Sequence, residues 1–269
     1  MPELPEMENY RGLLVGRIVG RTITAVEIGR EKSINVSPEQ FCREVEGQAV
    51  SRVDRRAKHL LFHLTNRKVL VLHLMLGGMM VYGRMEDKPD RSIQVRLSFG
   101  EEHLFFIGLR LGYLHLHDET ELASLFAKLG PEPFDPQLTP DRMAERLRHK
   151  NSTLKNSLVD QSVLAGIGNC YSDEICFQAR LLPARRTSSL AEREIETLYA
   201  SMKEVLSEAA RYGGYMEMPL FKEDALTGGF DERCRVYDRE GEPCERCGNP
   251  IARQEVSSKK SFCCLQCQQ

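Results

Sequence analysis

Proline stands at the second position of the chain, with glutamates at positions 3 and 6. Removal of the initiator methionine, which is common before proline, would leave the free α-amine on Pro2. An unperturbed α-amine has a pKa of about 7.7–8.0, so it is available as a nucleophile near neutral pH. A structural explanation stands beside the chemical one. Proline suits the first turn of a helix, and the stretch PEMENYRGLL predicts a helix here.

Four cysteines near the end of the chain have the spacing of a metal site. Two C-x-x-C pairs, CERC and CLQC, lie sixteen residues apart and supply Cys244, Cys247, Cys264 and Cys267. This spacing is typical of zinc fingers, whose four thiolates close a structural site with no open position for catalysis. The alternative is a set of accidental buried thiols. Cys263 offers a competing register, but only Cys264 completes a C-x-x-C pair with Cys267.

Lys259 and Lys260 lie between the two cysteine pairs, in the stretch ARQEVSSKKSF. We expect a metal-held hairpin with these lysines at its tip. Such a tip is suited to enter a nucleic-acid groove. The alternative is an ordinary solvated turn.

The stretch LKNSLVDQSVLAGIGNCYSDE predicts two helices joined by a glycine turn. The first helix is expected to end at Gly166–Gly168 and the second to begin at Asn169. A helix N-terminus offers unpaired N–H groups that suit a phosphate, and Lys155 would add positive charge. The alternative is a plain connector between helices.

A basic stretch, DRRAKHLLFHL, precedes an apolar run in the first half of the chain. Arg55, Arg56 and Lys58 are expected at the mouth of the strand, either facing a ligand or as ordinary surface charge. Three histidines alternate with apolar residues on predicted strands and are expected to be core or half-buried residues rather than ligands: His63, His73 and His115.

The elements that must position these residues fall into two classes. Residues 15–118 hold six β-branched or apolar runs, with one short helix at SPEQFCREV capped by Ser37, and predict an antiparallel sandwich or barrel-like sheet. A short helix is expected at about 119–129. The proline-rich stretch GPEPFDPQLTPDR predicts a linker, after which the apolar period becomes helical.

Composition adds few constraints. The chain has 269 residues and a net charge of −2, so any nucleic-acid binding must come from local basic patches. No stretch is apolar enough to span a bilayer, and the acidic start does not predict an export signal. The expected location is the cytoplasm, and for a bacterial DNA-binding protein the nucleoid.

Together these motifs resemble one family, the formamidopyrimidine-DNA glycosylase/endonuclease VIII family of base-excision repair enzymes. The resemblance covers essentially the whole chain. It rests on PELPE, the lysine of RRAKHLL, HLMLGG, DQSVLAGIGNCYSDE and the terminal VYDREGEPCERCG…CLQCQ. It implies an α+β fold with three domains. These are an N-terminal antiparallel β-sandwich over 1–130, a helix-two-turn-helix domain over 131–233 and a four-cysteine zinc finger over 234–269.

The resemblance also implies roles for individual residues. In this family the proline amine attacks C1′ of the damaged nucleotide and forms a Schiff base, and the adjacent glutamate donates and shuttles protons. These roles fall on Pro2 and Glu3, with Lys58 and Lys259 as further catalytic residues and Glu6 and Glu174 as supporting acids. The implied DNA-binding residues are Leu76, Arg110, Lys155, Asn169 and Lys260. The implied cofactor is one structural Zn²⁺.

Several positions depart from the family pattern. Leu76 stands where the gap-filling residue is typically Met. The usual DPRRFG loop is IGLRLG, so that Arg110 survives but Leu111 replaces Phe. A family histidine near position 91 is missing, and Lys259 replaces an arginine, which keeps the charge but loses the bidentate fork.

The sequence therefore predicts a monomeric glycosylase acting on double-stranded damaged DNA. It would remove an oxidised base, of the formamidopyrimidine or 8-oxoguanine type, and cleave the abasic site by β- or β,δ-elimination. Two alternatives remain: an endonuclease VIII-like glycosylase for oxidised pyrimidines, and a non-catalytic binder of abasic or distorted DNA.

Overall fold

The computed structural model describes residues 1–269 and divides them into two compact units. The first unit holds Met1–Ala127 together with Tyr212–Gly229. The second holds Lys128–Arg211 and Phe230–Gln269. None of the helices combines the length and hydropathy that crossing a bilayer requires.

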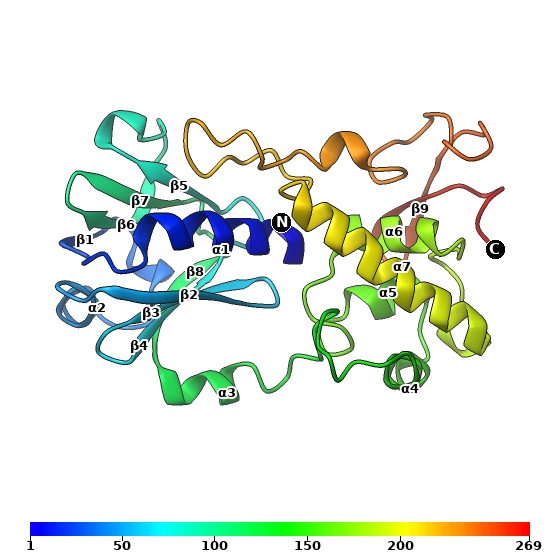
Figure 1. The fold of residues 1–269 in the computed structure, drawn as a ribbon, viewed down its shortest axis with the longest axis horizontal. Coiled ribbons are helices and arrows are strands. Elements are labelled where there is room, and N and C mark those ends of the chain that lie inside the picture. Colours follow the sequence, from blue (N-terminus) through cyan, green and yellow to red (C-terminus); the bar gives the residue numbers. More distant parts are fainter. The chain divides into compact units, whose positions relative to one another are not determined.

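The first unit is a β-sandwich of two four-stranded antiparallel sheets (Figure 1). One sheet has the order β1-β6-β7-β5 and the other β2-β3-β4-β8. The strands are β1 (Ala25–Ile28), β2 (Val50–Arg56), β3 (His59–Leu64), β4 (Lys68–His73), β5 (Met79–Gly83), β6 (Ile93–Phe99), β7 (Glu102–Ile107) and β8 (Tyr113–Asp118). The sandwich is as predicted.

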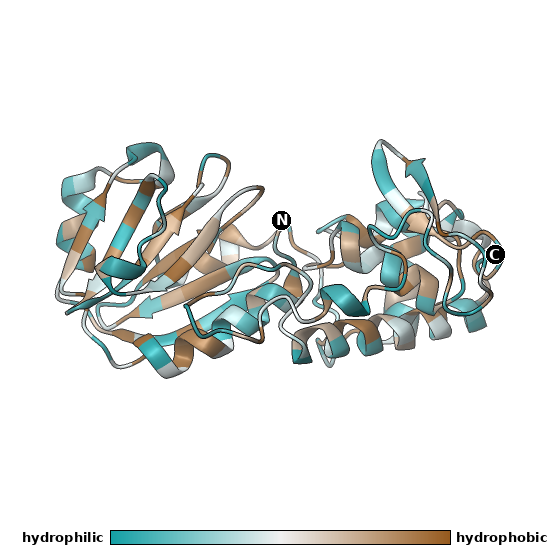
Figure 2. Cartoon of the chain, turned by 90° about the horizontal axis from the view of Figure 1, so that it is seen from above, coloured by the Kyte–Doolittle hydropathy of each residue, from teal (hydrophilic) through white to brown (hydrophobic).

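Helix α1 (Leu4–Ile18) runs alongside the two sheets of this unit (Figure 1). Its residues Met7, Tyr10, Leu14 and Ile18 recur at helical spacing and are fully buried in one core with residues of both sheets. In Figure 2 hydrophobic and hydrophilic bands alternate along the strands, as expected for strands with one buried face. Helix α2 (Pro38–Val45) begins as predicted, with the Ser37 hydroxyl accepting the N–H of Gln40.

The second unit is helical and ends in a hairpin. Its elements are α4 (Pro140–Lys150), α5 (Leu154–Val159), α6 (Asn169–Gln178), α7 (Glu192–Arg211), β9 (Ala252–Val256) and β10 (Lys259–Cys263). The predicted helix over 154–165 is shorter than expected. It ends at Val159 because the side chains of Asp160 and Gln161 bond the backbone of the following turn, at Ser162 and Gly166.

The outer face of the β2-β3-β4-β8 sheet carries a group of partly buried histidines. His59 and His73 lie with ring centroids 4.2 Å apart, and His115 stacks on Tyr113 at 4.0 Å. The short helix α3 (Leu122–Leu125), preceded by a single 3-10 turn, covers part of this face and is shorter than predicted. His63 is buried and His73 and His115 are half-buried, in agreement with the sequence.

These histidines should make the first unit acid-sensitive. Burial lowers the pKa of His59 to about 4, of His73 to about 3 and of His115 to about 4. As the pH falls below about 6.5 the unfolded chain binds protons that the folded chain does not, so stability is lost between about pH 6.5 and 4. We expect the free energy of unfolding to fall by about 5 kcal/mol from pH 7 to 5 in urea titrations, somewhat under about 2 kcal/mol for each histidine.

The double variant His59→Gln/His73→Gln should flatten this pH profile. His149→Gln is the matched control, because His149 is exposed on α4. An unchanged slope in the double variant would contradict the linkage.

Candidate active site and zinc site

Pro2 lies outside the first helix. Helix α1 begins at Leu4, with Glu3 at its N-cap and Pro5 in its first turn. Pro5, rather than Pro2, therefore satisfies the helix preference of proline. Pro2 is buried, and Glu3 beside it is only 2 % exposed. The structural explanation for proline at position 2 is thereby removed, whereas the chemical one remains.

Glu6 joins the start of α1 to a distant segment of the same unit. Its Oε2 accepts the backbone N–H of Glu3 at 2.7 Å, and its Oε1 accepts that of Tyr215 at 2.8 Å. Gly214 has φ +77°, and a Cβ there would lie 2.2 Å from Glu6 Oε1. The carboxylate is fully buried, so it acts here as a fixed hydrogen-bond acceptor.

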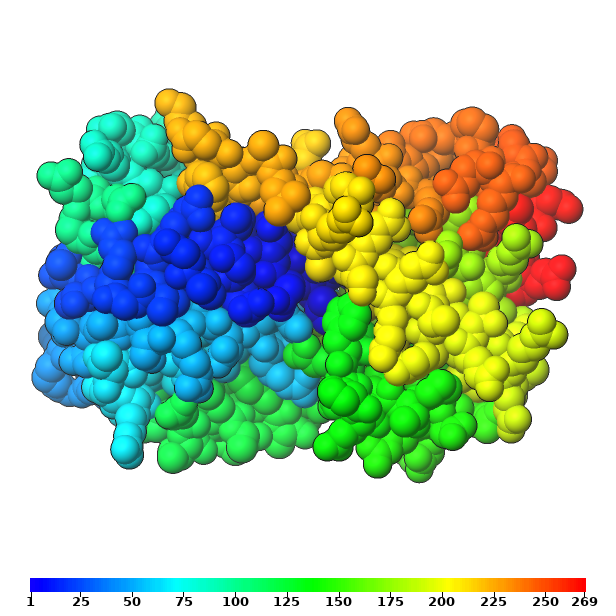
Figure 3. Space-filling view, in the orientation of Figure 1, coloured from blue at the N-terminus to red at the C-terminus, as the bar shows by residue number.

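The segment 213–229 packs along α1 (Figure 3). Asn9 donates to the Thr227 hydroxyl at 2.7 Å, and the Tyr10 hydroxyl donates to the Met218 carbonyl at 2.7 Å. From its length and its bounding glycines, the sequence predicts that the loop over 213–233 is mobile without DNA and tunes which base is excised, and this stays a prediction. The contacts above hold 213–229 against helix α1.

Lys58 lies in the two-residue turn between β2 and β3. The turn is made possible by a positive φ at Ala57, +52°. Lys58 is 5 % exposed, and this burial lowers the pKa of its ammonium, while the negative charges of Glu3 and Glu6 oppose the shift. A lysine with a lowered pKa is better able to accept a proton near neutral pH.

The two arginines before Lys58 end strand β2 and come directly before strand β3, as the sequence predicted. Arg55 donates from Nε to Glu8 of α1 at 2.9 Å, with only 9 % of its side chain exposed. A pairing of this kind removes Arg55 from the set of residues available to a ligand.

Two neighbouring loops present exposed leucines. Leu76 is 63 % exposed and Leu111 62 % exposed. Their loops touch through the backbone, since a Cβ on Gly108, which has φ +70°, would lie 2.0 Å from the Gly77 carbonyl oxygen. Arg110, also exposed, lies between them in sequence. The structure thus places Leu76 and Arg110, two of the implied DNA-binding residues, on neighbouring loops together with Leu111, which replaces the family phenylalanine.

In the second unit, Asn169 is exposed at the first turn of α6, as predicted. Lys155 is different. It is fully buried, with its Nζ 2.8 Å from Asp173 Oδ1 and 2.8 Å from the Asn169 carbonyl oxygen. An ammonium enclosed in this way does not reach a phosphate, so we correct the predicted direct contact: Lys155 supports the backbone of Asn169.

Glu174 is also a buried acceptor. Its carboxylate takes the backbone N–H groups of Arg235, Val236 and Tyr237 at 2.8–3.1 Å. Burial raises the pKa of Glu174, and these three N–H groups act against that rise. Its observed contacts anchor the segment that leads into the zinc finger.

The C-terminal hairpin has its turn at Ser257 and Ser258, both with positive φ. The lysines predicted at the tip instead begin strand β10. Lys260 is exposed, whereas the Nζ of Lys259 donates to Asn156 Oδ1 at 2.6 Å. Lys259 is therefore held against α5.

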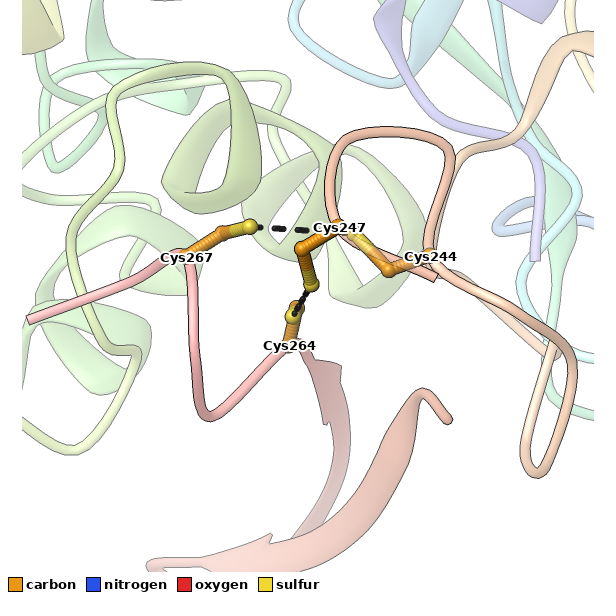
Figure 4. Close-up of side chains that lie close together, drawn as sticks. All are labelled: Cys244, Cys247, Cys264 and Cys267. Carbon is orange, nitrogen blue, oxygen red and sulfur yellow. Dashed lines mark hydrogen bonds between the residues drawn. The ribbon is translucent and has the colours of Figure 1, made fainter. Parts of the chain in front are cut away.

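The four predicted cysteines form a cluster (Figure 4). Their sulfur atoms all lie within 4.8 Å of one another, with Cys244–Cys267 at 3.9 Å and Cys247–Cys264 at 3.5 Å. Zn–S bonds of about 2.3 Å at tetrahedral angles require S–S separations of about 3.8 Å. The geometry fits one zinc ion, and with four thiolates the site is structural.

Sequence reasoning did not single out Asp173 or Ser261. Asp173 is fully buried on α6 and accepts the Ser261 hydroxyl of β10 at 2.6 Å. The sequence does contain a signal for Asp173, since SDE places two adjacent acids on a largely apolar helix. Buried acids on such a helix must find partners.

Comparisons with known proteins agree with this arrangement. Three family profiles match: the formamidopyrimidine-DNA glycosylase N-terminal domain over residues 1–113, its H2TH domain over 129–218, and a zinc finger found in FPG and IleRS over 241–269. A formamidopyrimidine-DNA glycosylase of Herpetosiphon aurantiacus is 36% identical over 272 residues, which cover 100% of both chains.

Two solved structures of the wild-type Lactococcus lactis Fpg are also similar. One is bound to DNA containing N7-benzyl-Fapy-dG, with 29% identity and a TM-score of 0.92, and the other to DNA containing an oxidised pyrimidine, with 30% identity and a TM-score of 0.92. In both cases 100% of each chain is covered.

Proposed function

Because the chain belongs to the formamidopyrimidine-DNA glycosylase family, we propose that it excises oxidised bases from double-stranded DNA and cleaves the resulting abasic site. The observation that carries the proposal is the position of Pro2, buried beside Glu3 and ahead of the helix cap. The preferred substrate is a formamidopyrimidine or 8-oxoguanine-type purine. The family name and the Fapy-dG complex of the L. lactis relative support this choice.

The reaction begins at the secondary amine of Pro2, freed by removal of Met1. The nitrogen attacks C1′, the glycosidic bond breaks, and its electron pair leaves with the base. Glu3 protonates the sugar ring oxygen as the ring opens, which leaves an iminium between Pro2 and C1′. The iminium withdraws electrons, so that loss of a 2′ proton expels the 3′ phosphate.

Lys58 and Lys259 complete the proposed catalytic set. Lys58 contacts phosphate and assists elimination, and its lowered pKa makes it better able to accept a proton in that step. Lys259 contacts phosphate and assists a second, δ-elimination, with Lys260 and Asn169 as further DNA contacts. Glu6 supports the site by holding the Glu3 backbone. The zinc supplies no chemistry, and it holds the hairpin that presents the two lysines.

A preference for oxidised pyrimidines is the second candidate. The complex of the L. lactis relative with an oxidised pyrimidine favours it, and the Leu76 and Leu111 pair is compatible with either preference. A panel of duplexes, each with one lesion, tests both. We expect the purine lesions to be cleaved fastest. Faster cleavage of oxidised pyrimidines would establish the second candidate, and tight binding of abasic DNA without cleavage would establish a non-catalytic binder.

Leu76 and Leu111 should fill the gap that a flipped nucleotide leaves in the duplex. The double variant Leu76→Ala/Leu111→Ala should slow base excision from duplex DNA by about tenfold, because unstacking costs a few kcal/mol that the leucines offset. Cleavage of an abasic site in single-stranded DNA, where there is no gap to fill, should be unaffected. Rates on the two substrates measure the difference.

Leu265→Ala is the matched control, since Leu265 is a leucine of similar exposure, 57 %, on the zinc finger. Equal slowing on both substrates would show that the two leucines do not act as a wedge.

A further inference from the structure

Asp173 lies at the meeting point of three elements of the second unit. It belongs to α6 and is fully buried. One carboxylate oxygen accepts the Ser261 hydroxyl at 2.6 Å and lies 2.8 Å from Lys155 Nζ, and the other accepts the backbone N–H of Phe262 at 3.1 Å. The side chain therefore ties α6 to α5 and to strand β10.

The Lys155–Asp173 pair is completely enclosed, with both side chains 0 % exposed. A buried ion pair is a costly way to stabilise a core, because apolar residues of the same volume often serve as well. What the pair supplies here is a fixed geometry: the same ammonium also holds the carbonyl of the exposed Asn169.

The contacts to β10 control the direction of Lys259. Side chains two residues apart on a strand point to the same face, so Lys259 and Ser261 face the helices together, while Lys260 faces outward. The distances agree, with Ser261 on Asp173 and Lys259 on Asn156 at 2.6 Å. A shift of β10 along α6 would move Lys259 with it.

We propose that Asp173 is a positioning residue that sets Lys259 of the zinc hairpin and Asn169 of α6 in register, so that both contact one DNA backbone. The inference rests on the proposed function, because Lys259 is taken as a phosphate contact. It concerns the geometry of unit 2 and is independent of the chemistry at Pro2. Neither Asp173 nor Ser261 touches the DNA itself in this scheme.

Asp173→Asn is the obvious variant, but it would leave the Lys155 ammonium buried without a counter-charge, and we expect it to unfold the unit. Ser261→Ala is the sharper test. It removes one tie between β10 and Asp173 and keeps the ion pair. Ser157→Ala is the matched control, because Ser157 is an equally buried serine of α5 whose hydroxyl has no hydrogen-bond partner.

The probe is a duplex with one tetrahydrofuran abasic-site analogue, titrated at several salt concentrations. For Ser261→Ala we expect the Kd to rise by about tenfold, as for loss of a hydrogen bond to a charged group. The slope of log K against log salt should fall by about one unit, as for loss of one phosphate contact. Ser157→Ala should match the wild type in both. Introduced into the wild-type protein, Lys259→Met should raise the Kd. Introduced into Ser261→Ala, it should raise the Kd little further.

Measuring zinc content distinguishes loss of Lys259 positioning from damage to the metal site. The content should stay at one ion per chain in every variant. A wild-type salt slope in Ser261→Ala, full additivity with Lys259→Met, or loss of zinc from Ser261→Ala would each overturn the positioning role. Wild-type protein that neither binds the duplex nor cleaves an abasic site refutes the proposed function instead. Wild-type protein that does both, with Ser261→Ala equal to Ser157→Ala, refutes only the positioning role.

Discussion

Pro2→Gly should reduce borohydride trapping of the protein on abasic-site DNA, and cleavage of that DNA, by more than about 100-fold. An iminium is reducible, so borohydride converts the intermediate into a stable covalent complex that denaturing gels resolve. Glycine replaces the secondary amine of proline with a primary one and loosens the backbone, and both changes act on the attacking atom. A small residual activity of the glycine amine is expected.

Pro5→Ala is the matched control for this variant. Pro5 is a buried proline three residues away, in the first turn of α1, where alanine is an excellent helix former. It should keep trapping close to the wild type. Full trapping by Pro2→Gly would show that another amine attacks the sugar, and Lys58 would be the next residue to test.

Attack by the Pro2 amine also requires that Met1 has been removed from the active protein. A peptide bond to Met1 would make the Pro2 nitrogen an amide, which is not a nucleophile near neutral pH. We therefore expect intact-mass measurement of trapped complexes to show only chains without Met1. Trapped chains that retain Met1 would contradict the attack by Pro2.

Much of the fold could be predicted because its local patterns are strong. Alternating apolar residues predicted the strands, and Ser37 followed by proline predicted the start of α2. The zinc ligands could be predicted completely, because tetrahedral coordination by two C-x-x-C pairs depends on spacing that is visible in the sequence. These features depend on residues close together in the chain.

The features that the sequence did not predict are those set by contacts between residues distant in the chain. A lysine beside a phosphate and a lysine inside an ion pair look alike in the sequence, so the burial of Lys155 against Asp173 could not be foreseen. The same holds for segment 213–229, which Glu6 and Asn9 attach to α1 across more than two hundred residues. The division into three domains at 130 and 233 stays a prediction, since contacts within the chain group 212–229 with the first unit.

Removal of one zinc ligand is the second change for which we expect a large effect, on zinc content and on DNA affinity. Cys264→Ser should lower zinc content from one ion per chain to near zero, since structural zinc contributes about 10–16 kcal/mol of binding energy to small zinc-finger domains. The small core of the finger, which includes Phe262 and Ile251 around Cys264, should loosen with it. Affinity for abasic-site duplex should then fall, because Lys259 and Lys260 lose their fixed strand. Metal analysis of the purified protein and binding titrations measure the two losses.

Cys263→Ser and Cys42→Ser are the controls that show whether zinc loss is specific to the four cysteine ligands. Cys263 ends strand β10 directly before Cys264 but lies outside the cluster of four sulfur atoms, and Cys42 lies in the first unit. Both variants should keep one zinc. If Cys263→Ser lost the metal while Cys264→Ser kept it, the register of the second C-x-x-C pair would be wrong. If folded wild-type protein held no zinc, the hairpin would have to be maintained by its apolar core and by the bonds from Ser261 and Phe262 to Asp173. That core is too small to make this the expected result, because domains of a few dozen residues rarely bury enough apolar surface to fold without a metal or disulfides.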